Sequence, residues 1–215
     1  MRGRCVAGLR VDGRGWVRPI ASQTDHGQLY STHYRLNDNT DPEVLDVITL
    51  DLAVRSPIPG QPENWAIGER PWVLVSRPAA PHLYGILRSA LAVGPLLLGS
   101  LDKRISANLA VQANASLALV APSSTTWFIG RDIHGHSQPR VLIELNGQSY
   151  NLPITDPAWT SLILRKLSRL EGAAHPQEAI GISAASRVLL TVSLSEAFNG
   201  YCYKLVAGIV VIPDF

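Results

Sequence analysis

The dipeptide Asn146-Gly147 lies between two strand-like segments and restricts the fold of this chain more than any other feature. The segment Arg140 to Leu145 before it is rich in β-branched and large apolar residues, as strands are. Both central residues of a type I′ turn need positive φ, which Asn and Gly tolerate best. The sequence therefore predicts a β-hairpin whose returning strand covers residues 148–154.

A helix is predicted directly after this hairpin. Asp156 is a typical N-cap, Pro157 suits the first helical position, and Gly172 follows as a stop signal. Five apolar residues share helical spacing: Trp159, Leu162, Ile163, Leu167 and Leu170. With strands predicted at residues 126–130, 187–194 and 203–212, the order is three strands, a helix and two strands. This is the order of an OB-fold, a five-stranded Greek-key barrel.

The first half of the chain is also predicted to be β-rich. Its candidate strands are residues 4–11, 15–21, 45–54, 71–77 and 116–121. The polar segment 22–40 and the proline-rich segment 56–70 are predicted loops, and residues 83–93 a helix. We therefore expect a mainly β chain of two tandem OB-like five-stranded barrels. The first would comprise residues 1–123 with loop insertions, and the second residues 124–215.

Composition limits the class of protein further. Hydrophobic residues make up 46% of the chain and charged residues 17%, which are ordinary values for a globular protein. The most apolar run, residues 90–99, is too short to span a bilayer, and Met1 is not followed by an apolar signal region. We expect a cytoplasmic protein without a cofactor. Cys5 and Cys202 lie in apolar segments and are predicted to be buried free thiols.

Three stretches of the sequence resemble a known family, the bacterial dual OB-containing domain proteins. They are Cys5-Val-Ala-Gly8 with Trp16-Val-Arg-Pro-Ile20, the central Tyr150-Asn-Leu-Pro-Ile-Thr-Asp-Pro157, and the terminal Ser193-Leu-Ser-Glu-Ala-Phe-Asn-Gly-Tyr-Cys-Tyr-Lys204. The resemblance spans nearly the whole chain. It implies two tandem OB barrels and, by way of the fold, binding of nucleic acid or nucleotides.

The N-terminal hairpin offers one candidate binding surface. Trp16 and Arg18 are two residues apart on a predicted strand, so they share a face on which a base would stack beside a guanidinium. The alternative is an ordinary sheet residue beside a solvated charge. Residues 1–20 hold five arginines against one acid, Asp12, which favours a basic patch. The arginines are Arg2, Arg4, Arg10, Arg14 and Arg18.

The second half offers another candidate surface, because OB barrels bind oligonucleotides around strands 2 and 3 and the loops 1–2 and 4–5. Tyr150, Phe198 and Tyr201 are the candidates for stacking on bases. Arg131, Arg140 and Lys204 are the candidates for neutralising phosphate. These side chains predict a binding module for single-stranded nucleic acid or a nucleotide-type ligand, without membrane attachment.

Two other functions remain open from the sequence. Asp132, His134 and His136 alternate along one loop and are weak metal-ligand candidates, since no further ligand follows at zinc spacing. An enzyme acting on nucleotides at the junction of the barrels would use these three residues as acid, base or ligand. A subunit that binds a protein partner is the third possibility. No nucleophile elbow or Walker A sequence is present.

Overall fold

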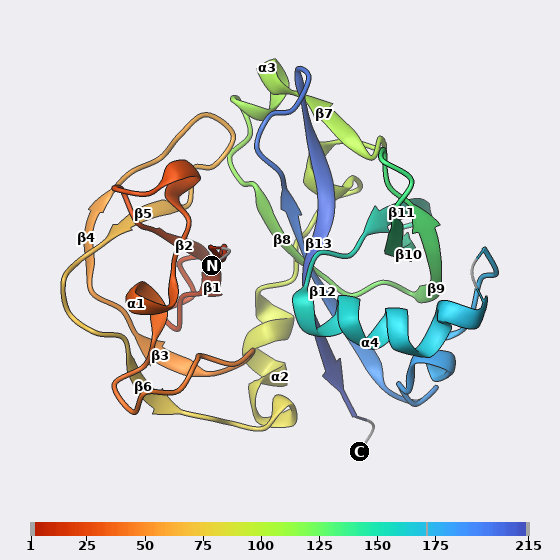
Figure 1. Ribbon diagram of the computed structural model, residues 1–215, viewed down its shortest axis with the longest axis horizontal. Coiled ribbons are helices and arrows are strands. Elements are labelled where there is room, and N and C mark those ends of the chain that lie inside the picture. The colour runs from red at the N-terminus through yellow and green to blue at the C-terminus, as the bar shows by residue number, and fades with distance from the viewer. Residues whose placement is uncertain (1–2, 171, 214–215) are drawn as a thin grey trace. The chain divides into compact units, whose positions relative to one another are not determined.

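The structure is a computed structural model that describes residues 3–170 and 172–213 (Figure 1). Its internal contacts divide the chain into two compact units, Met1–Ala90 and Leu91–Phe215. Strands cover more of the chain than helices do, so the prediction of a mainly β protein is confirmed. Within the described residues, no helix has both the length and the apolar character needed to cross a membrane.

The first unit is built from short strands. Its elements are β1 (Gly8–Leu9), β2 (Trp16–Ile20), a 3₁₀ helix (Asp25–Gly27), α1 (Ser31–Tyr34), β3 (Val47–Thr49), β4 (Leu52–Arg55), β5 (Asn64–Ile67), β6 (Val73–Ser76) and α2 (Ala80–Ser89). One sheet has the order β1-β2-β5-β4, and β3 pairs with β6 in another. Strands β2 and β5 run parallel, and the other named pairs are antiparallel. The core of this unit contains Ala21, Leu29, Tyr34, Leu36 and Trp72.

Strand β5 corrects the prediction for the first half, because it lies within the segment expected to be a loop. Pro57, Pro59 and Pro62 precede it and favour a loop in the sequence. In the structure, residues 64–67 alternate between buried and half-buried positions, as the residues of a paired strand do. Cys5 is a second correction. It is exposed, because it precedes the first sheet, whereas Cys202 is buried as predicted. Burial raises the pKa of the Cys202 thiol.

The second unit contains longer strands. Its elements are a 3₁₀ helix (Leu97–Gly99), β7 (Arg104–Ser106), α3 (Ala107–Ala110), β8 (Leu117–Val120), β9 (Ser124–Arg131), β10 (Ser137–Leu145), β11 (Gln148–Pro153), α4 (Pro157–Leu167), 3₁₀ helices at Ser168–Leu170 and Gln177–Ile180, β12 (Arg187–Leu194) and β13 (Tyr201–Ile212). The predicted order of strands and helix from β9 to β13 is confirmed. Asn146 and Gly147 have φ values of 52° and 75°, as the predicted turn requires.

The strands of the second unit pair in a curled arrangement. Strand β10 lies between β9 and β11, and β12 lies between β13 and β8. A parallel bridge between Ile154 and Val206 connects the end of β11 to β13. Strand β8 continues into β9 after only residues 121–123, so one length of chain pairs with β12 first and with β10 next. The same stretch therefore joins the three-stranded sheet to the four-stranded sheet.

This pairing moves the boundary between the two halves. The segment 116–121 was predicted to belong to the first half, but β8 pairs with β12, and β7 pairs with β13. Residues 91–123 therefore pack with the second unit, and the division falls after Ala90 rather than at residue 123. The pairing joins residues that are about 70 positions apart, which local sequence signals do not reveal.

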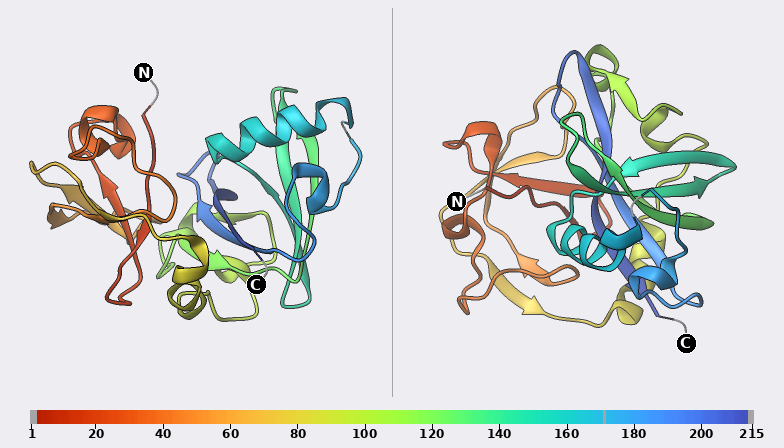
Figure 2. Two further views of the ribbon diagram at one scale, coloured as in Figure 1. Left: turned by 90° about the horizontal axis from the view of Figure 1, so that it is seen from below. Right: turned by 45° about the vertical axis from the view of Figure 1, so that its right-hand side comes forward.

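Helix α4 covers one end of the curled sheet (Figure 2). The Asp156 carboxylate accepts hydrogen bonds from the backbone N–H groups of Ala158 and Trp159, at 2.9 and 3.1 Å, and caps the helix as predicted. Ile163 and Leu167 have no exposed surface and pack into the core of this unit. The helix thus covers the core at one end of the curled sheet with its apolar side chains.

Candidate functional site

The strands β9, β10 and β11 have one buried and one outer face. Inward-pointing residues such as Trp127, Val141 and Leu152 are completely buried. Alternate residues point outward, because successive side chains on a strand lie on opposite faces. We call this outward surface the Arg140 face; it consists of Phe128, Gly130, Gln138, Arg140, Leu142 and Asn151. It extends over the first three strands of the predicted barrel, and OB-folds bind oligonucleotides around the second and third.

Arg140 lies at the centre of this face and is held by neutral acceptors. Its Nε atom donates to Asn151 Oδ1 at 2.7 Å, and its Nη2 atom donates to the Asn151 backbone oxygen at 3.1 Å. Its Nη1 atom donates to Gln138 Oε1 at 2.9 Å. Partial burial lowers the pKa of Arg140, although an arginine keeps its charge in proteins. Within the described residues, no carboxylate forms an ion pair with this guanidinium.

Gly130 provides the space in which the Arg140 stem lies. A Cβ atom added at Gly130 would lie 2.8 Å from Arg140 Cδ and 3.7 Å from the Phe128 ring. Phe128 is the cross-strand partner of Arg140 and is only partly buried. An aromatic residue and an arginine therefore occupy paired positions on one outer sheet face, and single-strand binders combine these two types of side chain.

The loop between β9 and β10 is closed by Asp132. Its Oδ1 atom accepts from the backbone N–H groups of His134 and His136, both at 2.8 Å. Hydrogen bonds from the His136 and His134 backbone lower the pKa of Asp132. The carboxylate thus orders the loop, and no group of three His, Cys, Asp or Glu side chains suited to a metal occurs among the described residues. Arg131 is exposed at the end of β9, and its Nη1 atom donates to Gly135 O at 3.1 Å.

The loop between β12 and β13 presents the two predicted aromatic residues. Phe198 is 53% exposed, and it bridges to Tyr201 across a turn at Asn199 and Gly200. The Arg104 guanidinium carbon lies 3.9 Å from the centre of the Tyr201 ring, a cation–π arrangement. Sequence reasoning missed Arg104, because β7 pairs with β13 across nearly 100 residues of chain. This loop therefore carries one free aromatic ring and one ring already covered by a cation.

Tyr150 and Lys204 are in the interior rather than on the surface expected from the sequence. Tyr150 is 3% exposed, and its hydroxyl accepts a 3.1 Å hydrogen bond from the backbone N–H of Leu97. Lys204 has no exposed surface, and its Nζ atom donates to the backbone oxygen of Ser100. Both residues share the inward face of their strand with core residues, Leu152 and Val206. Neither side chain is placed where it could touch a surface-bound ligand.

The N-terminal hairpin also differs from the predicted binding surface. Trp16 is partly buried opposite Leu9, and Arg18 is only 7% exposed because β2 lies between β1 and β5. Arg10 and Arg14 each form an ion pair with Asp12, and the Arg10 hydrogen bonds hold the pKa of this carboxyl well below its usual range. Arg4 pairs with Asp41 at 3.3 Å, and Arg2 lies outside the described residues. Asp12 and Asp41 thus offset part of the positive charge around this hairpin.

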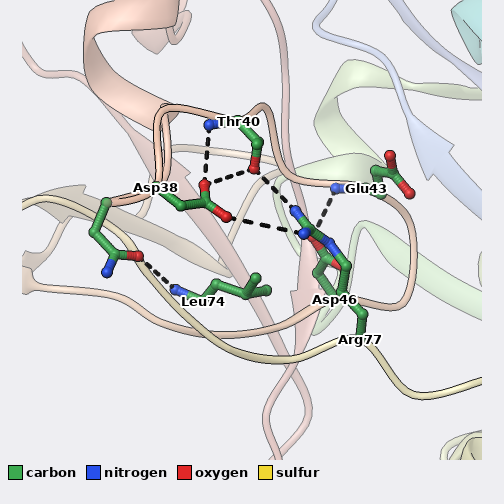
Figure 3. Close-up of polar contacts among 7 residues, drawn as sticks. Asp38, Thr40, Glu43, Asp46, Leu74 and Arg77 are labelled. Atoms are coloured by element: carbon green, nitrogen blue, oxygen red, sulfur yellow. Dashed lines mark hydrogen bonds and ion pairs between the residues drawn. The ribbon is translucent and has the colours of Figure 1, made fainter.

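Arg77 in the first unit shows how an arginine is used for structure (Figure 3). Its Nε atom lies 3.2 Å from an oxygen of Asp46, whose side chain is 4% exposed. Its Nη2 atom donates to the Thr40 hydroxyl at 2.9 Å, and that hydroxyl donates to Asp38 at 2.6 Å. Hydrogen bonds from Thr40 lower the pKa of Asp38. These contacts attach the loop before β3 to the residue that follows β6.

The pairing order, the helix between the third and fourth strands and the open Arg140 face define a protein of the OB-fold class. The chain belongs to the dual OB-containing domain family, whose model matches residues 1–209. The resemblance inferred from the sequence is thereby confirmed. No curated protein and no solved structure matched the chain.

Proposed function

We propose that the second unit is a five-stranded OB barrel that binds single-stranded nucleic acid on the Arg140 face. In this barrel, β8 and β9 together form the first strand, which pairs with β12 and with β10. The observation that carries the proposal is the Arg140 guanidinium. It is positioned by three hydrogen bonds and surrounded by neutral groups.

The chemistry of the face favours a phosphate backbone with stacked bases. A guanidinium forms paired, charge-assisted hydrogen bonds with phosphate oxygens. Phe128 beside it and Phe198 on the loop between β12 and β13 supply aromatic surface, on which any base stacks. Arg131 adds a cation at the end of β9. Tyr150, Lys204 and Arg18 are not part of this proposed surface, because they are buried.

The test is binding of a fluorescent single-stranded oligonucleotide of about 16 nucleotides, close to the largest site of one OB fold. Anisotropy is measured over a series of salt concentrations for the wild type, Arg140→Ala and Arg165→Ala. Arg165 is an exposed arginine on α4 and serves as the matched control. Arg140→Ala should weaken binding and reduce the salt slope by about 0.7, the contribution of one phosphate contact. Equal binding by both variants would contradict the proposed face.

A further inference from the structure

Several described arginines of this chain contact carboxylates, whereas Arg140 does not. Arg4, Arg10 and Arg77 contact carboxylates, at 3.3 Å to Asp41 for Arg4 and 3.2 Å to Asp46 for Arg77. Figure 3 shows this kind of contact around Arg77. Arg140 is held at similar distances, but by amide and backbone oxygens. The geometry of its guanidinium is thus fixed without a compensating negative charge.

We infer that Asn151 is the positioning residue that fixes the Arg140 fork without neutralising it, so that this face selects anionic ligands. The inference rests on the proposed function and names the ligand chemistry, a phosphodiester or another phosphate. Asn151 supplies two of the three acceptors, its side-chain Oδ1 and its backbone oxygen. An aspartate has nearly the same shape and would accept the same hydrogen bonds, but it would cancel the charge.

The free donors of Arg140 agree with such a ligand. A guanidinium carries five N–H groups, and the three hydrogen bonds leave two of them on the terminal nitrogens. Two adjacent donors match two oxygens of one phosphate. Because the guanidinium is partly buried, water screens its attraction for an anion less than it would at a fully exposed site.

The Gln138 contact supports the same interpretation. Gln138 supplies the third acceptor from the strand that carries Arg140, and it is also an amide rather than an acid. Glu144 points to the same side of β10, four residues beyond Arg140, but it accepts a hydrogen bond from Ser149 and makes no ion pair with Arg140. The described neighbours of Arg140 thus hold its guanidinium in place and leave its positive charge available to an anionic ligand.

The experiment compares Asn151→Asp with Arg140→Ala and with the double variant in the oligonucleotide assay. Ser161→Asp, at an exposed position on α4, matches the change in net charge. Asn151→Asp should lower the affinity about tenfold or more at low salt and reduce the salt slope by about 0.7, while its melting temperature is unchanged or raised. The double variant should bind no more weakly than Arg140→Ala, because the aspartate acts through the arginine.

Either of two results would overturn the inference: wild-type affinity for Asn151→Asp, or additive losses in the double variant. A second probe separates this inference from the proposed function. Inorganic pyrophosphate is titrated while the ¹⁵N signal of Arg140 Nε is followed, in the wild type and in Asn151→Asp. If the wild type binds no oligonucleotide but its Arg140 signal shifts with pyrophosphate, the proposed function fails and anion selection stands. No shift in the wild type, or an equal shift in Asn151→Asp, would refute anion selection.

Discussion

The Nζ atom of Lys204 lies 5.2 Å from the centre of the Tyr150 ring, on the inward face of the curled sheet. A lysine with no exposed surface is rare, because removing an ammonium from water is costly. Burial lowers the pKa of Lys204 to about 8, and the nearby Asp102 partly offsets that shift. The backbone oxygen of Ser100 is the acceptor that makes the position tolerable.

This lysine should make the second unit more stable at alkaline pH. In the unfolded chain Lys204 has its ordinary pKa of 10.5, so between pH 8 and 10.5 the unfolded state binds more protons than the folded state. The free energy of unfolding should therefore rise across this window, by about 3 kcal/mol for one fully coupled group. Below pH 8 the folded state bears the full free-energy cost of burying a charged lysine, and above pH 10.5 this cost disappears. Urea unfolding at several pH values measures the rise, and Lys204→Met should abolish it. The same rise in that variant would assign it to another group.

Tyr150→Phe should destabilise the second unit and leave ligand binding unchanged. The substitution removes the acceptor of the Leu97 N–H and leaves a donor inside the core, since Leu97 is only 3% exposed. An unsatisfied buried donor costs about 1–3 kcal/mol. Urea unfolding tests the first part, and oligonucleotide binding by the folded variant tests the second. Reduced binding with unchanged stability would instead indicate that Tyr150 contacts the ligand.

Gly130→Ala should weaken ligand binding with little effect on stability. The added Cβ would lie 2.8 Å from Arg140 Cδ, so the arginine stem must move and its fork leave Asn151. Gly130 is not among the glycines with positive φ, so its backbone accepts alanine without strain. Gly208→Ala is the matched control, since its Cβ would meet Thr191 at an ordinary 3.6 Å. Anisotropy and thermal melting are measured for both variants. Equal affinities would show that the position of the Arg140 stem does not matter.

Arg77→Met should loosen the first unit and leave the second unchanged. The variant removes the ion pair of the buried Asp46 carboxylate and the hydrogen bond to Thr40. The side chain of Arg77 is 40% exposed, so the cost is limited to about 1 kcal/mol. Amide hydrogen exchange should speed up in β3 and β6, while protection in β12 stays constant. Faster exchange in β12 as well would show that the two units unfold together.

Much of the second unit was predictable because its signals are local. The Asn146-Gly147 turn and the Asp156 cap fixed the hairpin and the helix, and alternating residues fixed the strand faces. Alternation also accounts for the burial of Tyr150. It is two residues from the fully buried Leu152 on the same strand, so it must face inward. Lys204 shows the same alternation with Cys202 and Val206, but the acceptor that makes a buried lysine tolerable lies about 100 residues away and gives no local signal.

Arg140, Arg131 and Phe198 could be named from the sequence as candidates, but the contacts around Arg140 could not. Arg140 was identified from its place on the second strand, but its partner Asn151 depends on the register between β10 and β11. Phe128 was overlooked because it lies on the first strand, and its proximity to Arg140 follows from the pairing of β9 with β10. The basic N-terminal hairpin looked more open in the sequence than it is, since a charge count over residues 1–20 shows neither the ion pair of Arg4 with Asp41 nor the burial of Arg18.

The division of one length of chain between β8 and β9 has a consequence for synthesis on the ribosome. Strand β8 pairs with β12, so residues 117–120 have no partner until residues 190–193 have emerged. The hairpin of β9 with β10 needs no such delay, because its partners follow within about 20 residues. The first 90 residues form their own contacts and precede both. The nascent chain is therefore expected to complete its first unit first and to keep an unpaired apolar strand, β8, until β12 has emerged.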